Sequence, residues 1–181
     1  MVEEGREQIS QDPLRHESLD DICALPVEQW VDENAVLFLW FTFPLMEQVM
    51  SPRITWNDDG TVTIKPRIYE AWGFKYSQIA WVWRKYNEET GKFAYGPGTA
   101  TRKNLEPCII CWRGNNEVFD KTVRDFIDDF MDEKRREHSQ KPDKQYENIE
   151  AMFDGPYLEM FATQPRDGWD RWAPKAHAFR D

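Results

Sequence analysis

The sequence predicts an α/β fold with a mainly parallel sheet and flanking helices. Apolar runs of strand length alternate along the chain with segments of helical pattern, which is the order typical of α/β domains. Several of these runs are continuous rather than alternating, as expected for strands that are covered on both faces. The chain has no internal repeat and no low-complexity tract, and no linker divides it.

The first elements are a short helix, a strand and a second helix. Ser18 is placed as the N-cap of the first helix, with Asp21 three residues later, and the helix ends before Pro26. The apolar run over residues 36–41 predicts a buried strand. A helix follows Pro44 and is interrupted by a Ser-Pro pair.

A surface hairpin is predicted as an insertion over residues 51–66. Residues 54–56 and 61–64 are rich in β-branched residues and flank the turn sequence Asn-Asp-Asp-Gly at 57–60. An Asp-Gly turn between two such segments is a strong hairpin signal.

The middle of the chain alternates again between helix and strand. A helix is expected over residues 67–72 with Gly73 as its C-cap, followed by strands over 79–83 and 107–112. Residues 86–104 contain Gly, Pro, Thr and charged residues and predict a long loop. Long loops inside compact domains are often functional.

The last third of the chain contains one ambiguous segment and one clear helix. Residues 123–131 fit a strand or a helix, and the spacing of their apolar residues slightly favours a helix. Pro142 begins a helix whose apolar residues share one face, and residues 157–162 form the final strand.

Composition limits the class of protein. The 181 residues include nine Trp, eleven Phe and six Tyr, which is typical of a folded domain rather than a disordered chain. No segment approaches the roughly 20 apolar residues of a membrane span. The polar, acidic N-terminus is unlike a signal peptide, and three cysteines make no disulfide framework. These features predict a reduced, cytoplasmic location without membrane or metal partners.

The net charge of −10 argues against indiscriminate nucleic-acid binding. Affinity for phosphates comes largely from Lys and Arg, so any contact with nucleic acid must use a local basic patch. Residues 1–17 are expected to be a flexible segment, residues 18–175 one domain, and residues 176–181 a tail.

Lys141 stands just before a helix N-terminus, where the helix dipole is already positive. The arrangement is explained if an anion, a carboxylate or a phosphate, docks there beside the backbone N–H groups. The alternative is a solvated charge cluster in which Lys141 points away.

Cys108 and Cys111 have the spacing of a metal or redox motif. On a strand, however, residues three apart face opposite sides, and no second cysteine pair completes a zinc site. We therefore expect both to be buried structural residues. The chain has no glycine-rich phosphate loop of either standard pattern.

Several segments together resemble the MT-A70 family of adenine-N6 methyltransferases, especially its bacterial and phage branch. The similarity covers about residues 15–175, and the matching pieces occur in family order. They read SLDDICALP from Ser18, VLFLW from Val36, EAWGF from Glu70, WVW from Trp81, RREHSQKPD from Arg135, YLEMFA from Tyr157 and GWDRW from Gly168.

The resemblance implies a Rossmann-like methyltransferase core that binds S-adenosylmethionine and methylates adenine N6 in nucleic acid, with DNA favoured over RNA. It places Lys141, Glu159 and Phe161 near the cofactor. Phosphate contacts are expected from four cationic side chains: Arg102, Lys103, Arg135 and Arg136. In the family an Asp-Pro-Pro-Trp loop holds the target amine, and in duplex DNA the base must first leave the helix.

The sequence also departs from the family. It contains no Asp-Pro-Pro-Trp, and the 17 residues before Ser18 contain no strand pattern, so the core is expected to lack an N-terminal strand. Asp12 and Pro13 are the only candidate remnant. Thr163 replaces a family arginine, and Ala-Pro-Lys at 173–175 replaces Gly-Asn-Glu. Three readings stay open: a methyltransferase, an inactive subunit that binds nucleic acid or an active MT-A70-type partner, and an inert fragment.

Overall fold

The computed structural model describes residues 18–98, 100–115, 122–123, 127–137 and 140–173. The predicted remnant at Asp12 and Pro13 and the tail at 176–181 lie outside these residues. The chain divides into two compact units, a larger one over Leu19–Gly155 and a smaller one that contains Pro156 onward. Each unit is described by itself.

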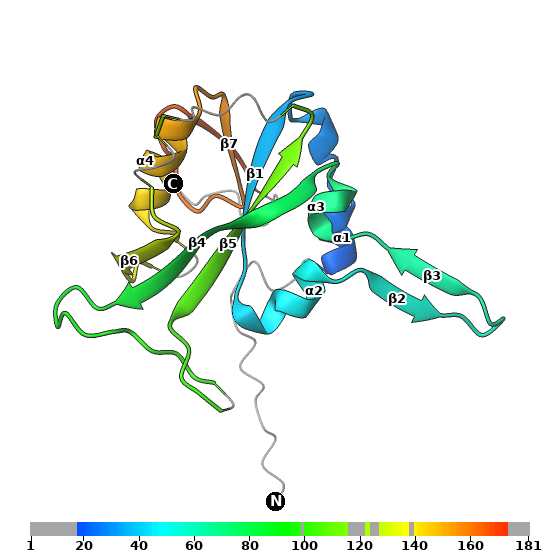
Figure 1. Cartoon of the computed structure of the whole chain (residues 1–181), viewed down its shortest axis with the longest axis horizontal. Helices are drawn as coiled ribbons and strands as arrows, with labels where there is room; N and C mark the ends of the chain where they lie inside the picture. The colour runs from blue at the N-terminus through cyan, green and yellow to red at the C-terminus, as the bar shows by residue number, and fades with distance from the viewer. Residues whose placement is uncertain (1–17, 99, 116–121, 124–126, 138–139, 174–181) are drawn as a thin grey trace, which may run out of the picture. The chain divides into compact units, whose positions relative to one another are not determined.

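The elements follow one another in an order close to the predicted one (Figure 1). In the larger unit they are α1 (Leu19–Cys23), β1 (Ala35–Trp40), α2 (Met46–Met50), β2 (Arg53–Trp56), β3 (Val62–Lys65), α3 (Ile68–Ala71), β4 (Lys75–Tyr86), β5 (Leu105–Arg113), β6 (Phe130–Lys134) and α4 (Asp143–Met152). In the smaller unit they are β7 (Tyr157–Met160) and β8 (Trp169–Trp172). No helix among the described residues is long and apolar enough to cross a membrane.

A four-stranded sheet with the order β1-β5-β4-β6 forms the centre of the larger unit. The α/β class is confirmed, but the sheet is mixed rather than mainly parallel. β1 and β4 both pair antiparallel with β5, and β4 pairs parallel with β6. The pattern of apolar residues indicates which residues are buried. It does not indicate whether neighbouring strands run parallel or antiparallel. The β4–β5 connection is a loop rather than a crossover helix, which permits antiparallel pairing.

The ambiguous segment near residue 130 forms a strand where it is described. Phe130 and Met131 begin β6 and pair with Val82 and Trp83 of β4. The slight preference for a helix was therefore wrong at these two residues. Hydrogen bonding to an available sheet edge outweighs a short apolar spacing that fits either structure.

The core lies around β5, whose residues 107–111 are buried. The run over residues 36–41, predicted to be a buried strand, is half-buried along β1, and only Phe41 after it is buried. On one face the Phe38 ring stacks on Trp81 with centroids 4.8 Å apart, and Trp40 meets Trp83 edge to face at 6.4 Å. Helix α4 is joined to this layer by a hydrogen bond from Trp40 Nε1 to Gln145 Oε1. Trp40 of β1 thus ties α4 to the sheet.

The predicted hairpin over 51–66 is present as the antiparallel pair β2–β3. Its turn requires Gly60 at φ +81°, which a side chain would strain. β2 and β3 pair with each other and form a sheet separate from the central one. Figure 1 shows the hairpin extending away from the central sheet.

The smaller unit contains the parallel pair β7–β8. The Tyr157 and Trp169 rings stack across the two strands with centroids 4.7 Å apart. Phe161 follows β7 at φ +59°, the only non-glycine residue with positive φ among the described residues.

Candidate functional site

Glu106 and Lys141 form the centre of the candidate site. Lys141 Nζ lies 2.8 Å from Glu106 Oε2, and Lys85 Nζ pairs with the other carboxylate oxygen. Lys85 lies near the end of β4, Glu106 near the start of β5, and Lys141 just before α4. The antiparallel register places Glu106 opposite Trp83, two residues from Lys85. We call these three residues the Glu106 cluster.

The carboxylate of Glu106 is ionised although its side chain is only 12% exposed. Desolvation by burial raises the pKa of Glu106, but the attraction and hydrogen bonds of Lys141 and Lys85 outweigh it, and the net pKa is lowered. The chain itself therefore supplies a carboxylate to Lys141. The alternative, in which Lys141 points away, is wrong. The ammonium also lies 5.8 Å from the Trp40 ring centre.

A cleft of about 510 Å³ lies beside this cluster, with Glu106 and Lys85 in its wall. Its lining contains four cationic side chains, from Lys85, Arg102, Lys103 and Arg135, and one carboxylate. In a chain of net charge −10, this is a local concentration of positive charge of the kind that phosphate contacts require.

The predicted long loop over 86–104 forms one wall of the cleft. It folds back on itself: Gly96 and Lys103 exchange backbone hydrogen bonds of 2.6 and 3.1 Å. The guanidinium of Arg102 lies 4.7 Å from the centre of the Tyr95 ring, a cation–π distance. The loop therefore presents both a cation and an aromatic ring to the cleft.

The structure brings together three of the four predicted phosphate-binding residues, namely Arg102, Lys103 and Arg135. Arg136 instead forms an ion pair with Asp143 at the start of α4. Sequence reasoning missed Glu106, Lys85 and Tyr95. A single acidic residue directly before the buried run of β5 was the available signal for Glu106.

Glu159 and Phe161 belong to the smaller unit, Glu159 within β7 and Phe161 directly after it. The Phe161 ring meets Trp172 edge to face at 5.2 Å. Its left-handed backbone is costly for a residue with a side chain, and such strain is concentrated at functional sites.

Cys108 and Cys111 are both fully buried, as predicted for structural cysteines. Burial raises the pKa of the Cys108 thiol well above its ordinary value and that of Cys111 to about 12. Among the described residues no group of three His, Cys, Asp or Glu side chains could hold a metal ion.

Comparison with known proteins shows the family of the chain. The family model MT-A70 matches residues 4–175. The chain belongs to the MT-A70 family. It is also 25% identical over 155 residues to the type II methyltransferase M.MunI of Mycoplasma sp, in an alignment covering 85% of this chain and 56% of M.MunI. The chain therefore spans about half the length of this curated relative. The larger unit contains most of the segments that resemble the family, including the one with Lys141.

Proposed function

We propose that this MT-A70 chain is an S-adenosylmethionine-dependent methyltransferase domain that acts on adenine N6 in nucleic acid, with DNA favoured over RNA. The observation that carries the proposal is the basic cleft beside the Glu106 cluster. DNA is favoured because the sequence most resembles the bacterial and phage branch of the family.

The cleft suits a nucleic acid strand in two ways. Arg102, Lys103 and Arg135 provide positive charge for backbone phosphates. The ring of Tyr95 provides a surface on which a base can stack, and the adjacent Arg102 strengthens such stacking. Arg136 is proposed as a further phosphate contact at the start of α4, where it also pairs with Asp143.

The Glu106 cluster carries groups that can pair with those of S-adenosylmethionine. The cofactor carries an ammonium, a carboxylate and ribose hydroxyls, and it supplies the methyl group when bound. Lys141 can bind a carboxylate, and the ionised Glu106 can accept hydrogen bonds from hydroxyl or ammonium groups. Glu159 and Phe161 are proposed as cofactor-binding residues on the family resemblance, and the strained backbone of Phe161 supports its role.

Activity is proposed to depend on a second MT-A70-type subunit. The sequence contains no Asp-Pro-Pro-Trp to hold the target amine, and removing one comparable polar contact in an active site costs about 3–4 kcal/mol of transition-state stabilisation. Asp12 and Pro13 are the candidate remnant within this chain.

The second candidate function is a catalytically inactive subunit that binds nucleic acid or an active partner. Two features favour it: the missing motif and Thr163 in place of the family arginine. The two functions differ in whether the chain binds the cofactor at all.

Calorimetric titration with S-adenosylmethionine distinguishes them. We expect binding by the unmodified chain, loss of binding in Lys141→Ala, and unchanged binding in Lys144→Ala, an exposed lysine on α4 that pairs with Glu147. Failure of the unmodified, folded chain to bind the cofactor would instead support the inactive subunit. If the Asp12→Ala variant methylates as well as the parent chain, Asp12 is not a remnant of the Asp-Pro-Pro-Trp motif.

A further inference from the structure

Arg84 lies at the centre of a group of contacts near the end of β4. Its Nε and Nη2 atoms donate to the two carboxylate oxygens of Asp132 at 2.6 and 2.5 Å. The same guanidinium lies 4.2 Å from the centre of the Phe93 ring and 5.1 Å from that of the Phe130 ring, both within the range of cation–π contacts. One side chain therefore joins β6, which contains Asp132 and Phe130, to the loop that contains Phe93.

Strand β6 fixes the orientation of the guanidinium. The parallel register of β4 and β6 places Asp132 opposite Arg84 and Phe130 opposite Val82. Alternate residues of a strand share a face, so Arg84, Asp132 and Phe130 lie on the same face of the sheet. The bidentate pair with Asp132 also sets the plane of the guanidinium, which a single hydrogen bond would not do. The sheet therefore holds Arg84 in a defined position against the loop.

Phe93 ties the returning limb of the loop between β4 and β5 to the end of β4. It forms an antiparallel bridge with Tyr86, and the N–H of Ala94 donates to a carbonyl of β4 at 2.8 Å. Two residues after Phe93 comes Tyr95, which belongs to the wall of the cleft. The position of Tyr95 therefore depends on a limb that the contact between Arg84 and Phe93 holds against β4.

Arg84 itself is not among the described residues that line the cleft. Neighbouring side chains of a strand face opposite sides, so Arg84 lies on the other face of the sheet from Lys85. Its charge is balanced by Asp132. Arg102, by contrast, lines the cleft and lies over the Tyr95 ring. Arg84 is therefore placed to act on a nucleic acid through Tyr95 and not by contacting phosphates.

We propose that Arg84 is a positioning residue for nucleic-acid binding, which holds the Tyr95 ring in the cleft wall so that a base can stack on it. This inference rests on the proposed function and adds to it a residue outside the cleft. A ring that is already held in place loses less conformational freedom when a base stacks on it, which favours binding. Arg84 and Phe93 are both partly exposed, so their substitution should loosen the loop and leave the core folded.

Hydrogen exchange of the chain without DNA tests the first step. Arg84→Gln removes the guanidinium and Phe93→Leu removes the ring. In each variant the Ala94 amide should exchange about tenfold faster, because its hydrogen bond to β4 opens more often. Amides of β5 should keep their parent rates, which would show that the core is folded. Lys75→Gln removes an exposed cation from the other end of β4 and, as the matched control, should exchange like the parent. Unchanged exchange of Ala94 in Arg84→Gln and Phe93→Leu would overturn the proposal.

Binding of a fluorescently labelled DNA oligonucleotide tests the second step. Tyr95→Leu should weaken binding about fivefold or more, Arg84→Gln almost as much, and Lys75→Gln not at all. In the Tyr95→Leu background Arg84→Gln should cause no further loss, because both substitutions act through the same ring. The slope of log affinity against log salt should be the same in Arg84→Gln as in the parent, since no phosphate contact is lost. Additive losses, or a slope lowered by about 1, would mean that Arg84 contacts phosphate directly and would refute the positioning role.

Failure of this inference and failure of the proposed function give different results. A parent chain that binds no DNA at any salt concentration would refute nucleic-acid binding and, with it, the stacking role of Tyr95. Faster exchange of Ala94 in Arg84→Gln and Phe93→Leu would even then show that Arg84 holds the loop. DNA binding by the parent with full affinity in Arg84→Gln would refute the role of Arg84 and leave the proposed function intact.

Discussion

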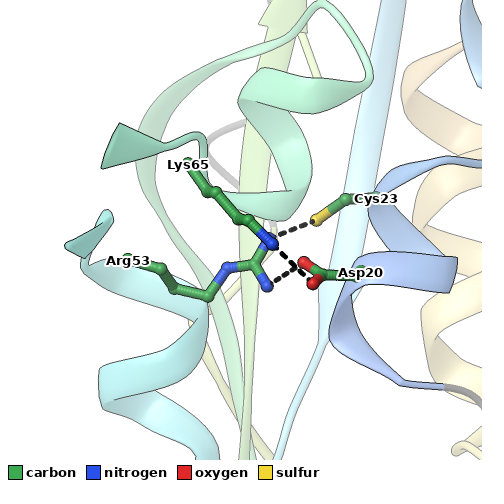
Figure 2. Close-up of polar contacts among 4 residues, drawn as sticks. All are labelled: Asp20, Cys23, Arg53 and Lys65. Atoms are coloured by element: carbon green, nitrogen blue, oxygen red, sulfur yellow. Dashed lines mark hydrogen bonds and ion pairs between the residues drawn. The ribbon is translucent and has the colours of Figure 1, made fainter. Parts of the chain in front are cut away.

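The Glu106 cluster and the Asp20 cluster, which consists of Asp20, Arg53 and Lys65 (Figure 2), share one charge pattern in different surroundings. Each consists of one carboxylate held by two cations. The Glu106 side chain is 12% exposed, whereas that of Asp20 is 53% exposed. Water solvates the charges of Asp20 well, so its ion pairs add little. Glu106 has lost much of its water and depends on its lysines. The comparison shows that burial, rather than the number of ion pairs, decides how much such a cluster matters.

The largest expected effect is the loss of stability in Glu106→Gln. The substitution leaves Lys85 and Lys141 without their counter-charge in a partly buried position. We expect a loss of about 2–3 kcal/mol in the free energy of unfolding, somewhat below the cost of breaking a fully buried pair. Urea unfolding followed by tryptophan fluorescence measures it.

Asp20→Asn is the matched control for that substitution. Its exposed carboxylate is surrounded by water, so the unfolding midpoint should not change measurably. Equal losses of stability in the two variants would show that burial does not distinguish the two clusters.

The pH dependence of stability provides the second test. The folded pKa of Glu106 is lowered below the ordinary value of 4.5, so the unfolded chain takes up the proton more readily. The stabilisation is therefore complete above pH 4.5 and is lost as the pH falls through the folded pKa. Stability of the parent should decline steeply in this acid range, and Glu106→Gln should flatten the decline more than Asp20→Asn does. An identical decline in parent and Glu106→Gln would contradict the assignment.

The third test compares the cations near the two clusters for nucleic-acid binding. Arg102→Ala and Lys103→Ala each remove a cation from the cleft. Each should weaken binding to DNA of any sequence and lower the slope of log affinity against log salt by about 1. Lys65→Ala removes a cation of the Asp20 cluster instead and should leave the slope unchanged. Fluorescence anisotropy with a labelled oligonucleotide measures all three, and a slope that falls only in Lys65→Ala would assign binding to the hairpin.

Sequence reasoning located one of the three residues of the Glu106 cluster. Lys141 was conspicuous because a cation before a helix N-terminus is locally unfavourable. Its partner Glu106 lies 35 residues earlier, and only the sheet register and the packing of α4 bring them together. Local spacing contains no information on such a contact. For the same reason Arg136 was expected to meet phosphate, whereas the fold places Asp143 beside it.

The hairpin was the easier region to predict, because its contacts are local. The turn sequence and the β-branched segments on either side specify both the strands and their register. The direction of the central strands was harder, since burial on both faces of β5 leaves the same apolar run in a parallel or an antiparallel sheet. Elements whose contacts are local in the sequence, such as the hairpin, were therefore predictable. The pairing of segments that are distant in the sequence was not.

The smallest expected effect is on the rates at which a thiol reagent modifies Cys23 and Cys108. Burial raises the pKa of Cys23, the negative charge of Asp20 raises it further, and Arg53 opposes both. Cys108 is fully buried, and its pKa lies far higher. Because the thiolate is the reactive form, a thiol reagent at mildly alkaline pH should modify Cys23 slowly and Cys108 only after unfolding.

Asp20→Asn removes the charge that disfavours the Cys23 thiolate and should speed its modification a few-fold. Glu106→Gln should leave the Cys23 rate unchanged, because the Glu106 cluster contributes nothing to the pKa of that thiol. Rapid modification of Cys108 in the native parent would mean that the core around β5 opens readily. Burial would then not protect the Cys108 thiol from the reagent. The contrast between the buried Glu106 cluster and the exposed Asp20 cluster would not hold either.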